Sequence, residues 1–199
     1  MAYDVTTGLV RFSYVQLAEP KQANPDSKAK YSVALLLPKS DTKTKERLAQ
    51  TLKECYLDAV ENVWGGRKPQ LNPVIKDGDG VKQNGEPYGP ECKGHWVINV
   101  ASVRQPWAID RQNSAIDIAE IKSGDYGQAA INAYAYSHPQ KSGVTFGLNG
   151  VRFIKTGEPL GGMGLAPAQA FPEPFADADL DFEEADSPDD ADDWSAMLG

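Results

Sequence analysis

Aromatic rings and cationic side chains occur close together at several points of this sequence. Rings can stack on the bases of a nucleic-acid strand and cations can contact its phosphates, and neither interaction depends on the base sequence. These side chains therefore predict a site for single-stranded DNA. The candidate residues are Arg11, Tyr14, Lys28, Lys30, Arg104, Trp107, Tyr134, Tyr136 and Lys141.

Many rings in such a sequence belong to the core instead. Residues that alternate in step with aliphatic neighbours are expected to be buried, and these are Phe12, Tyr31, Trp96, Phe146 and Phe153. Tyr134 and Tyr136 share a strand face with Asn132 rather than with the aliphatic residues between them, so both packing and stacking stay open for them. Trp107 lies in a polar stretch beside Arg104, which favours stacking.

Two features could be taken for catalytic or metal sites. Asp77 and Asp79 resemble the paired carboxylates of a metal-dependent nuclease, but that chemistry needs further converging acids, and Asp-Gly-Asp-Gly is typical of a tight turn. Cys92 and His95 are too few ligands for zinc. Cys55 falls in a helical pattern and is expected to be buried. The sequence predicts no metal, no cofactor and no enzymatic activity.

The elements that must position these residues are mostly strands. Strand patterns cover residues 5–18, 30–37, 94–104, 126–136 and 144–154. In the first, Val10, Phe12 and Tyr14 are expected on one face. Gly147 and Gly150 interrupt the last pattern, which indicates a bulge or a bend.

A helix capped by Ser40 or Asp41 and ended by Gly65-Gly66 follows the second strand. Its predicted buried stripe is Leu48, Leu52, Cys55, Tyr56, Ala59 and Val63, and its basic residues Lys43, Lys45, Arg47 and Lys53 are expected to be solvated. Residues 67–93 form an irregular insertion and residues 105–125 a further loop. One main helix among five strands predicts a mainly β fold, a five-stranded barrel of the oligonucleotide-binding (OB-fold) type.

The net charge of −8 hides a strong asymmetry. All 20 Lys and Arg lie before Pro172, together with 17 of the 28 acidic residues, so that part carries +3 and the remainder −11. We therefore expect two parts: a binding domain over residues 1–165, and a disordered acidic tail over residues 166–199. The tail ends in apolar residues behind acidic ones, which suits a basic groove on a partner protein. The candidate partner-binding residues are Asp192, Asp193, Trp194, Met197 and Leu198.

An ordered set of segments resembles a bacteriophage single-stranded-DNA-binding family formerly known only as a domain of unknown function. The set runs from Val10-Arg-Phe-Ser-Tyr14 and Lys30-Tyr-Ser-Val-Ala-Leu-Leu-Leu-Pro-Lys-Ser-Asp41 through Lys76-Asp-Gly-Asp79 and Gly94-His-Trp-Val-Ile-Asn99 to Ser123-Gly-Asp-Tyr-Gly127, Ile131-Asn-Ala-Tyr-Ala-Tyr136 and Gly143-Val-Thr-Phe-Gly-Leu-Asn149. The resemblance implies an OB-fold barrel and a role in phage DNA replication, recombination or repair. The tail is similar to the recruitment tails of bacterial single-strand binders, although it lacks their terminal Phe.

Two other classes of protein stay open at this stage. One is a phage nuclease that uses Asp77 and Asp79, and the other is an inhibitor whose acidic tail mimics DNA. The longest aliphatic run, Val33 to Leu37, is too short to span a bilayer. We therefore expect a cytoplasmic protein with no membrane partner, and the resemblance to the phage family implies the cytoplasm of an infected bacterial host. The sequence gives no indication of the oligomeric state.

Overall fold

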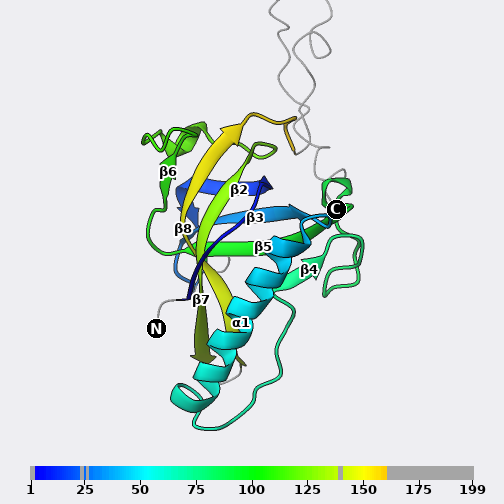
Figure 1. The fold of residues 1–199 in the computed structure, drawn as a ribbon, viewed down its shortest axis with the longest axis vertical. Coiled ribbons are helices and arrows are strands. Elements are labelled where there is room, and N and C mark those ends of the chain that lie inside the picture. The colour runs from blue at the N-terminus through cyan, green and yellow to red at the C-terminus, as the bar shows by residue number, and fades with distance from the viewer. Residues whose placement is uncertain (1–2, 23–24, 26, 139–140, 161–199) are drawn as a thin grey trace, which may run out of the picture. The chain divides into compact units, whose positions relative to one another are not determined.

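The computed structural model describes residues 3–22, 25, 27–138 and 141–160, which contain eight strands and one α-helix. The strands are β1 (Tyr3–Thr6), β2 (Val10–Lys21), β3 (Lys30–Pro38), β4 (Ile75–Asp77), β5 (His95–Ser102), β6 (Trp107–Ile109), β7 (Tyr126–His138) and β8 (Lys141–Lys155). The helix is α1 (Thr42–Asn62), and the 3-10 helices are η1 (Pro90–Cys92) and η2 (Ile118–Glu120). Figure 1 shows β3 and β5 crossing the long β7–β8 pair.

The five long strands form a partly closed barrel. They are hydrogen-bonded in the order β7-β2-β3-β5-β8, and β8 pairs with β7 to complete the ring. The seam between β5 and β8 is parallel and is held by one register pair, Ala101 with Gly147, whereas the other neighbours in the ring are antiparallel. This arrangement confirms the predicted mainly β fold with five principal strands and one helix. The short strands β1, β4 and β6 extend the sheet at its borders.

The inward faces of the long strands make the core. Alternating residues of each strand are buried there, among them Phe12, Leu35, Leu37, Ile98, Ile131, Phe146 and Val151. Of the predicted core rings, Phe12 and Phe146 are fully buried, and Trp96 and Phe153 pack against the core from its border. Tyr31 is half-buried. β3 is apolar on both faces because Leu36, on the outward face, packs with Cys92 and Val97 in a second small cluster.

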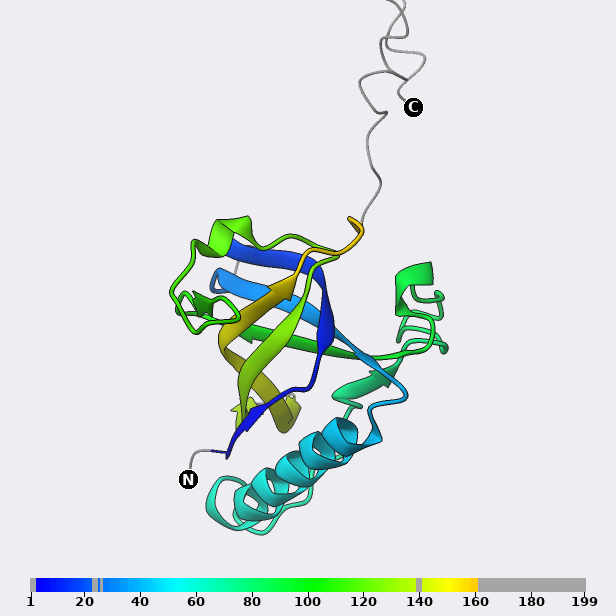
Figure 2. The same ribbon diagram turned by 45° about the horizontal axis from the view of Figure 1, so that its top comes forward.

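Helix α1 closes one end of the barrel. Its first turn is capped by Asp41, whose Oδ1 accepts a hydrogen bond from the Thr44 backbone N–H at 3.0 Å. Leu48, Cys55 and Ala59 are buried as expected, and the helix packs on β1, β7 and β8 (Figure 2). The prediction for Val63 was wrong, because the helix ends at Asn62 and leaves Val63 48% exposed.

Three segments differ from the sequence prediction. The expected first strand is two strands, β1 and β2, with a turn around Gly8 between them. The insertion at 67–93 contains β4 and η1, and the loop at 105–125 contains β6 and η2. The expected bulge in the last strand is confirmed, since Asn149 is the extra residue where the β7–β8 register shifts.

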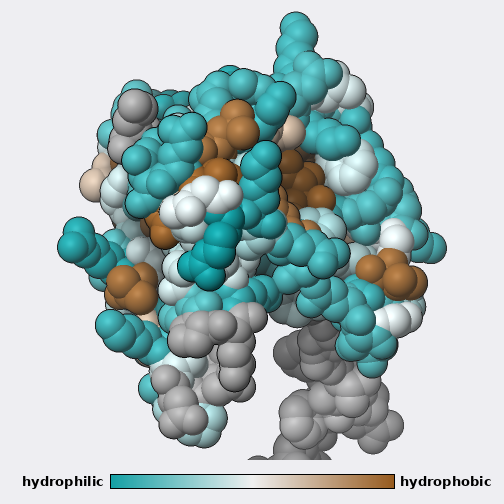
Figure 3. All heavy atoms as spheres, turned by 90° about the horizontal axis from the view of Figure 1, so that it is seen from below, coloured by the Kyte–Doolittle hydropathy of each residue, from teal (hydrophilic) through white to brown (hydrophobic). Residues whose placement is uncertain are grey.

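The surface on the side drawn in Figure 3 is mostly hydrophilic, with small apolar areas, one of which lies in a hollow. Within the described residues, no helix is long and apolar enough to cross a membrane. The predicted boundary between residues 165 and 166 lies outside the described part of the chain and stays a prediction.

Candidate nucleic-acid interface

A groove of about 1040 Å³ lies over the outward face of β3 and β5. Its floor consists of register-paired residues whose side chains point away from the core, namely Ser32 with Ala101, Ala34 with Asn99, and Leu36 with Val97. The strand alternation that buries Val33 and Leu35 inside the barrel turns small or polar residues outward in one part of the floor, namely Ser32, Ala34, Asn99 and Ala101, while Leu36 and Val97 make the other part apolar. The small side chains leave room for a flat or extended ligand. We call this hollow the main groove.

The end of the β7–β8 hairpin forms one wall of the main groove. Tyr134 and Tyr136 line it from β7, and Lys141 lines it from β8. The predicted alternation is confirmed, because Ile131 and Ala133 are buried while Tyr134 is 42% exposed. Burial, with a smaller contribution from the charge of Tyr136, raises the pKa of Tyr134. Both rings are therefore surface rings that keep one side against the protein.

Each tyrosine ring is seated on a glycine of β8. Tyr136 is register-paired with Gly143, and a β-carbon at that position would lie 3.1 Å from the Cζ atom of the ring. A β-carbon at Gly147 would lie 3.3 Å from Cε1 of Tyr134. The glycines leave space for the rings close to the strand, so the rings need little rearrangement before a base stacks on them.

Tyr14 and Lys30 also line the main groove. The prediction that Tyr14 shares the face of Phe12 was wrong. Tyr14 has a φ of 49° at a register shift between β2 and β3, so that Ser13 is buried and Tyr14 is 68% exposed. This bulge turns the Tyr14 ring out of the core and towards the groove.

The insertion supplies the opposite wall and contains residues that the sequence analysis missed. Lys76, Lys82 and Tyr88 line the main groove from this segment. Burial raises the pKa of Tyr88. The available signal was the length of an irregular segment inside a compact domain, which is typical of a functional loop. In total, four lysines and one glutamate line the groove, so its charge is positive.

A lysine clamp holds the insertion in place. Lys39 Nζ, at the end of β3, lies 2.6 Å from Asp77 Oδ1 and 2.6 Å from Asp79 Oδ2. The hydrogen bonds to Lys39 lower the pKa of both carboxyl groups, and those carboxylates raise the pKa of Lys39. Asp77 also accepts a hydrogen bond from the Asp79 backbone N–H within the turn, and Asp79 accepts one from the backbone N–H of Gly94, directly before β5. Their geometry is that of a turn fixed by one cation.

The described residues contain no group of three or more His, Cys, Asp or Glu side chains that could hold a metal ion. Cys55 and Cys92 are both buried free thiols, and burial raises the pKa of each.

Arg11 lies away from the main groove. Its Nε donates to the Gly124 carbonyl at 3.1 Å and its Nη2 donates to the Glu158 carbonyl at 2.6 Å. Its guanidinium also lies 5.5 Å from the centre of the Tyr126 ring. These contacts tie β2 to the residues before β7 and after β8, and the phosphate contact of Arg11 stays a prediction. Lys28 is exposed but lines neither of the hollows described here.

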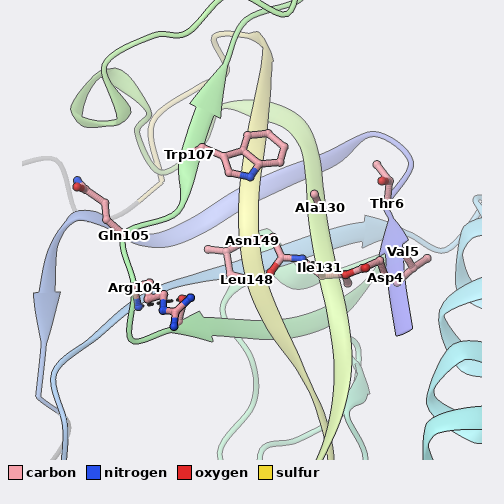
Figure 4. A pocket seen from close by; sticks show the side chains of 11 residues that line it. Asp4, Val5, Thr6, Arg104, Gln105, Trp107, Ala130, Ile131, Leu148 and Asn149 are labelled. Atoms are coloured by element: carbon pink, nitrogen blue, oxygen red, sulfur yellow. Dashed lines mark hydrogen bonds between the residues drawn. The ribbon is translucent and has the colours of Figure 1, made fainter. Parts of the chain in front are cut away.

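Arg104 and Trp107 line a second hollow of about 650 Å³ (Figure 4). The structure thus gathers five of the nine predicted DNA-binding residues in the main groove and two in this separate hollow.

Among the helix cations, Lys43, Arg47 and Lys53 are exposed as expected, whereas Lys45 lies over the Trp96 ring at 3.9 Å. The predicted partner-binding residues Asp192, Asp193, Trp194, Met197 and Leu198 lie outside the described residues.

Comparison with known proteins identifies the family. A family model described as the single-stranded-DNA-binding protein of Enterobacter phage Enc34 matches residues 3–183. The chain belongs to this phage family. The match confirms the family that the sequence segments resembled.

Solved structures and a curated relative agree with this assignment. The Enc34 protein in complex with single-stranded DNA has a TM-score of 0.69 and 25% identity, covering 79% of this chain and 89% of that one. The T7 single-stranded-DNA-binding protein gp2.5 shares the fold, with a TM-score of 0.56 and 14% identity over 81% of this chain and 91% of that one. Protein p50 of Acyrthosiphon pisum secondary endosymbiont phage 1 is 27% identical over 174 residues, which are 81% of this chain and 89% of the relative.

Proposed function

We propose that this protein binds single-stranded DNA in the main groove without base-sequence preference. The observation that carries the proposal is the meeting of Tyr14, Tyr134 and Tyr136 with lysines from three separate segments around one groove. Lys30 comes from β3, Lys76 and Lys82 from the insertion, and Lys141 from β8. The rings stack on bases and the lysines contact phosphates, while the floor of small side chains accommodates any base.

Membership of the phage family supports a proposal for the biological role. We propose that the protein covers single strands during phage DNA replication, recombination or repair in the cytoplasm of the bacterial host. Its acidic tail recruits replication or recombination proteins through Asp192, Asp193, Trp194, Met197 and Leu198. The protein acts by binding and not by catalysis, since Asp77 and Asp79 are occupied with Lys39.

The decisive experiment is a titration of the full chain into fluorescently labelled oligothymidine, a mixed-sequence strand and a duplex. We expect similar tight binding of both single strands and a steep loss of affinity as salt rises. A chain that ignores both single strands at modest ionic strength would contradict the proposal and favour the inhibitor alternative. Incubation of the same strands with Mg²⁺ tests the nuclease alternative, and we expect the strands to stay intact.

A further inference from the structure

The second hollow lies on the same sheet face as the aromatic wall of the main groove. It is lined from β1 by Asp4 and Thr6, from β7 by Ala130, from β8 by Asn149, from the β5–β6 connection by Arg104, and from the start of β6 by Trp107. Ala130 and Asn132 precede Tyr134 and Tyr136 on the outward face of β7. Where β5 meets β8, Ala101 lines the main groove and Ser102 lines the second hollow. Ala101 and Ser102 are neighbours on β5, so the two hollows lie next to each other where β5 meets β8.

Trp107 is seated in the same way as the two tyrosines. It is register-paired with Gly150 on β8, and a β-carbon at Gly150 would overlap the six-membered ring of the indole. The indole is nevertheless 49% exposed, although its neighbours Pro106 and Ala108 are buried. One face of the ring rests on the strand and the other is accessible. A large ring held against a glycine and open on its far side is a preformed surface for stacking.

Three rings thus follow the length of β8, over Gly143, Gly147 and Gly150. The first and last of these glycines are seven positions apart, which corresponds to roughly 20 Å of strand. A stacked strand advances about 3.4 Å per nucleotide, so this distance corresponds to about six nucleotide steps, and to fewer if the strand is stretched. A fragment of about three nucleotides cannot reach from Tyr136 to Trp107.

Arg104 and Asp4 set the charge of the second hollow. Figure 4 shows Arg104 and Trp107 on two sides of it, with Leu148 and Asn149 between them. The Asp4 carboxylate accepts a hydrogen bond from Asn149 Nδ2 at 3.3 Å. One cation and one anion leave the hollow close to neutral, so a ligand here gains mainly from the ring and not from charge.

We propose that Trp107 is a second stacking site, which binds a base of a DNA strand that leaves the main groove along β8, with Arg104 beside the adjoining phosphate. This inference rests on the proposed function, because the strand must already occupy the main groove. It adds that strands long enough to reach Trp107 bind more tightly than shorter ones, and that this gain depends on the Trp107 ring. Strands too short to reach Trp107 bind through the main groove alone.

The test compares oligothymidines of about three and about twelve nucleotides, using the full chain and its Trp107→Ala variant. We expect the variant to bind the short strand like the wild type and the long strand about 5- to 150-fold more weakly. The slope of affinity against salt should change little. Val103→Ala, which truncates a 59% exposed side chain in the same connection, is the matched control and should bind both strands normally.

A second variant keeps the Trp107 ring but fills the space that the ring occupies over Gly150. Gly150→Ala should displace the indole and reproduce the loss for the long strand only.

Fluorescence offers an independent measurement. In a Trp194→Phe background, the remaining indoles are Trp64, which is buried, Trp96, which is covered by two lysines, and Trp107. Indole emission should therefore be quenched by the long strand and not by the short one.

The outcomes separate the two proposals. If the wild type binds both strands and Trp107→Ala weakens both equally, or neither, the second stacking site is refuted while the main groove stands. If the wild type binds neither strand, the proposed function fails and the second stacking site fails with it.

Discussion

The ring of Tyr136 lies over Gly143, its direct partner across the β7–β8 hairpin. A β-carbon at Gly143 would be 2.8 Å from the tyrosine hydroxyl oxygen. Trp64 Nε1, beyond the end of α1, donates to the Tyr136 carbonyl at 3.4 Å and links the helix to this hairpin. Gly143 thus leaves room for the ring beside the strand, and the hydrogen bond from Trp64 holds the backbone that carries the ring.

Tyr136→Ala should weaken binding of oligothymidine while leaving the fold intact. Stacking contributes about 1–3 kcal/mol per base, so we expect a loss between about 5-fold and 150-fold in affinity. Fluorescence anisotropy measures the loss, and thermal unfolding checks the fold. Tyr136→Phe keeps the ring and should keep the affinity. A collapse of the fold in Tyr136→Ala would mean that the ring is core, contrary to the proposal.

Neutralising a lysine of the main groove should make binding less sensitive to salt. Each phosphate contact on a single strand contributes about 0.7 to the slope of log affinity against log salt. Lys76→Gln and Lys82→Gln should each reduce the slope by about that amount. Lys53→Gln removes the same charge from the exposed side of α1 and should leave the slope unchanged. Equal changes in all three variants would indicate a general charge effect instead of a groove.

The strands that carry the site were predictable where hydrophobic alternation was regular. In β7, the buried Ile131 and Ala133 and the outward tyrosines follow the period of two that the sequence shows. Alternation could not place Tyr14, because a non-glycine residue with positive φ breaks the period and turns the side chain over. The local sequence also does not determine which partners a surface cation contacts in the folded protein. Arg11 has the residue type of a phosphate contact, but backbone carbonyls more than 100 positions away accept its hydrogen bonds.

The wall formed by the insertion was not predictable from its own residues. Residues 67–93 have no regular period, so the sequence does not show where Lys76, Lys82 and Tyr88 point. The pairing of β4 with β5 places Lys76, and the turn after β4 is fixed by Lys39, which reaches Asp79 from 40 positions away in the chain. Such pairing requires the tertiary structure, and the sequence shows only that the residue types are available.

Arg11→Ala should destabilise the barrel without weakening DNA binding. Hydrogen bonds from a charged group contribute about 1.5–3 kcal/mol each, and the Arg11 side chain is only partly buried. We therefore expect the free energy of unfolding to fall by about 1–3 kcal/mol, measured by chemical denaturation. Arg111→Ala, at an exposed turn position, should change neither stability nor affinity. A loss of affinity in Arg11→Ala with unchanged stability would restore the phosphate-contact interpretation.

The lysine clamp predicts a specific pH behaviour. The folded pKa values of Asp77 and Asp79 lie below 3.8 because Lys39 donates to both carboxylates. The stabilisation from this pairing is therefore present above the unfolded pKa and is lost as pH falls through the lowered folded values. At the alkaline end, the pKa of Lys39 is raised above 10.5, so the pairing is lost only as pH rises beyond the raised value. The clamp should be constant across neutral pH.

Lys39→Gln tests the clamp directly. The titration midpoints of Asp77 and Asp79, followed by the NMR shifts of their carboxyl carbons, should rise towards ordinary aspartate values. If the insertion also loosens, affinity for oligothymidine falls because Lys76 and Lys82 lose their fixed place in the groove. Lys93→Gln, an exposed neighbour of the same turn, should shift the Asp79 midpoint much less, since its charge is only the smallest contributor to that pKa. Unchanged midpoints in Lys39→Gln would refute the clamp.

Removal of residues 172–199 should strengthen DNA binding, most visibly at low salt. These residues carry eleven acidic groups and no Lys or Arg, and they are tethered to a domain whose groove is positive. Tethering gives an effective concentration on the order of millimolar, so we expect the tail to compete with DNA for the groove lysines. Salt screens this competition, and truncated and full-length proteins should converge as ionic strength rises. A full-length variant with the tail acids changed to Asn and Gln should behave like the truncation, which separates charge from length. Equal or weaker binding after truncation would refute competition and leave the tail as a recruitment segment alone.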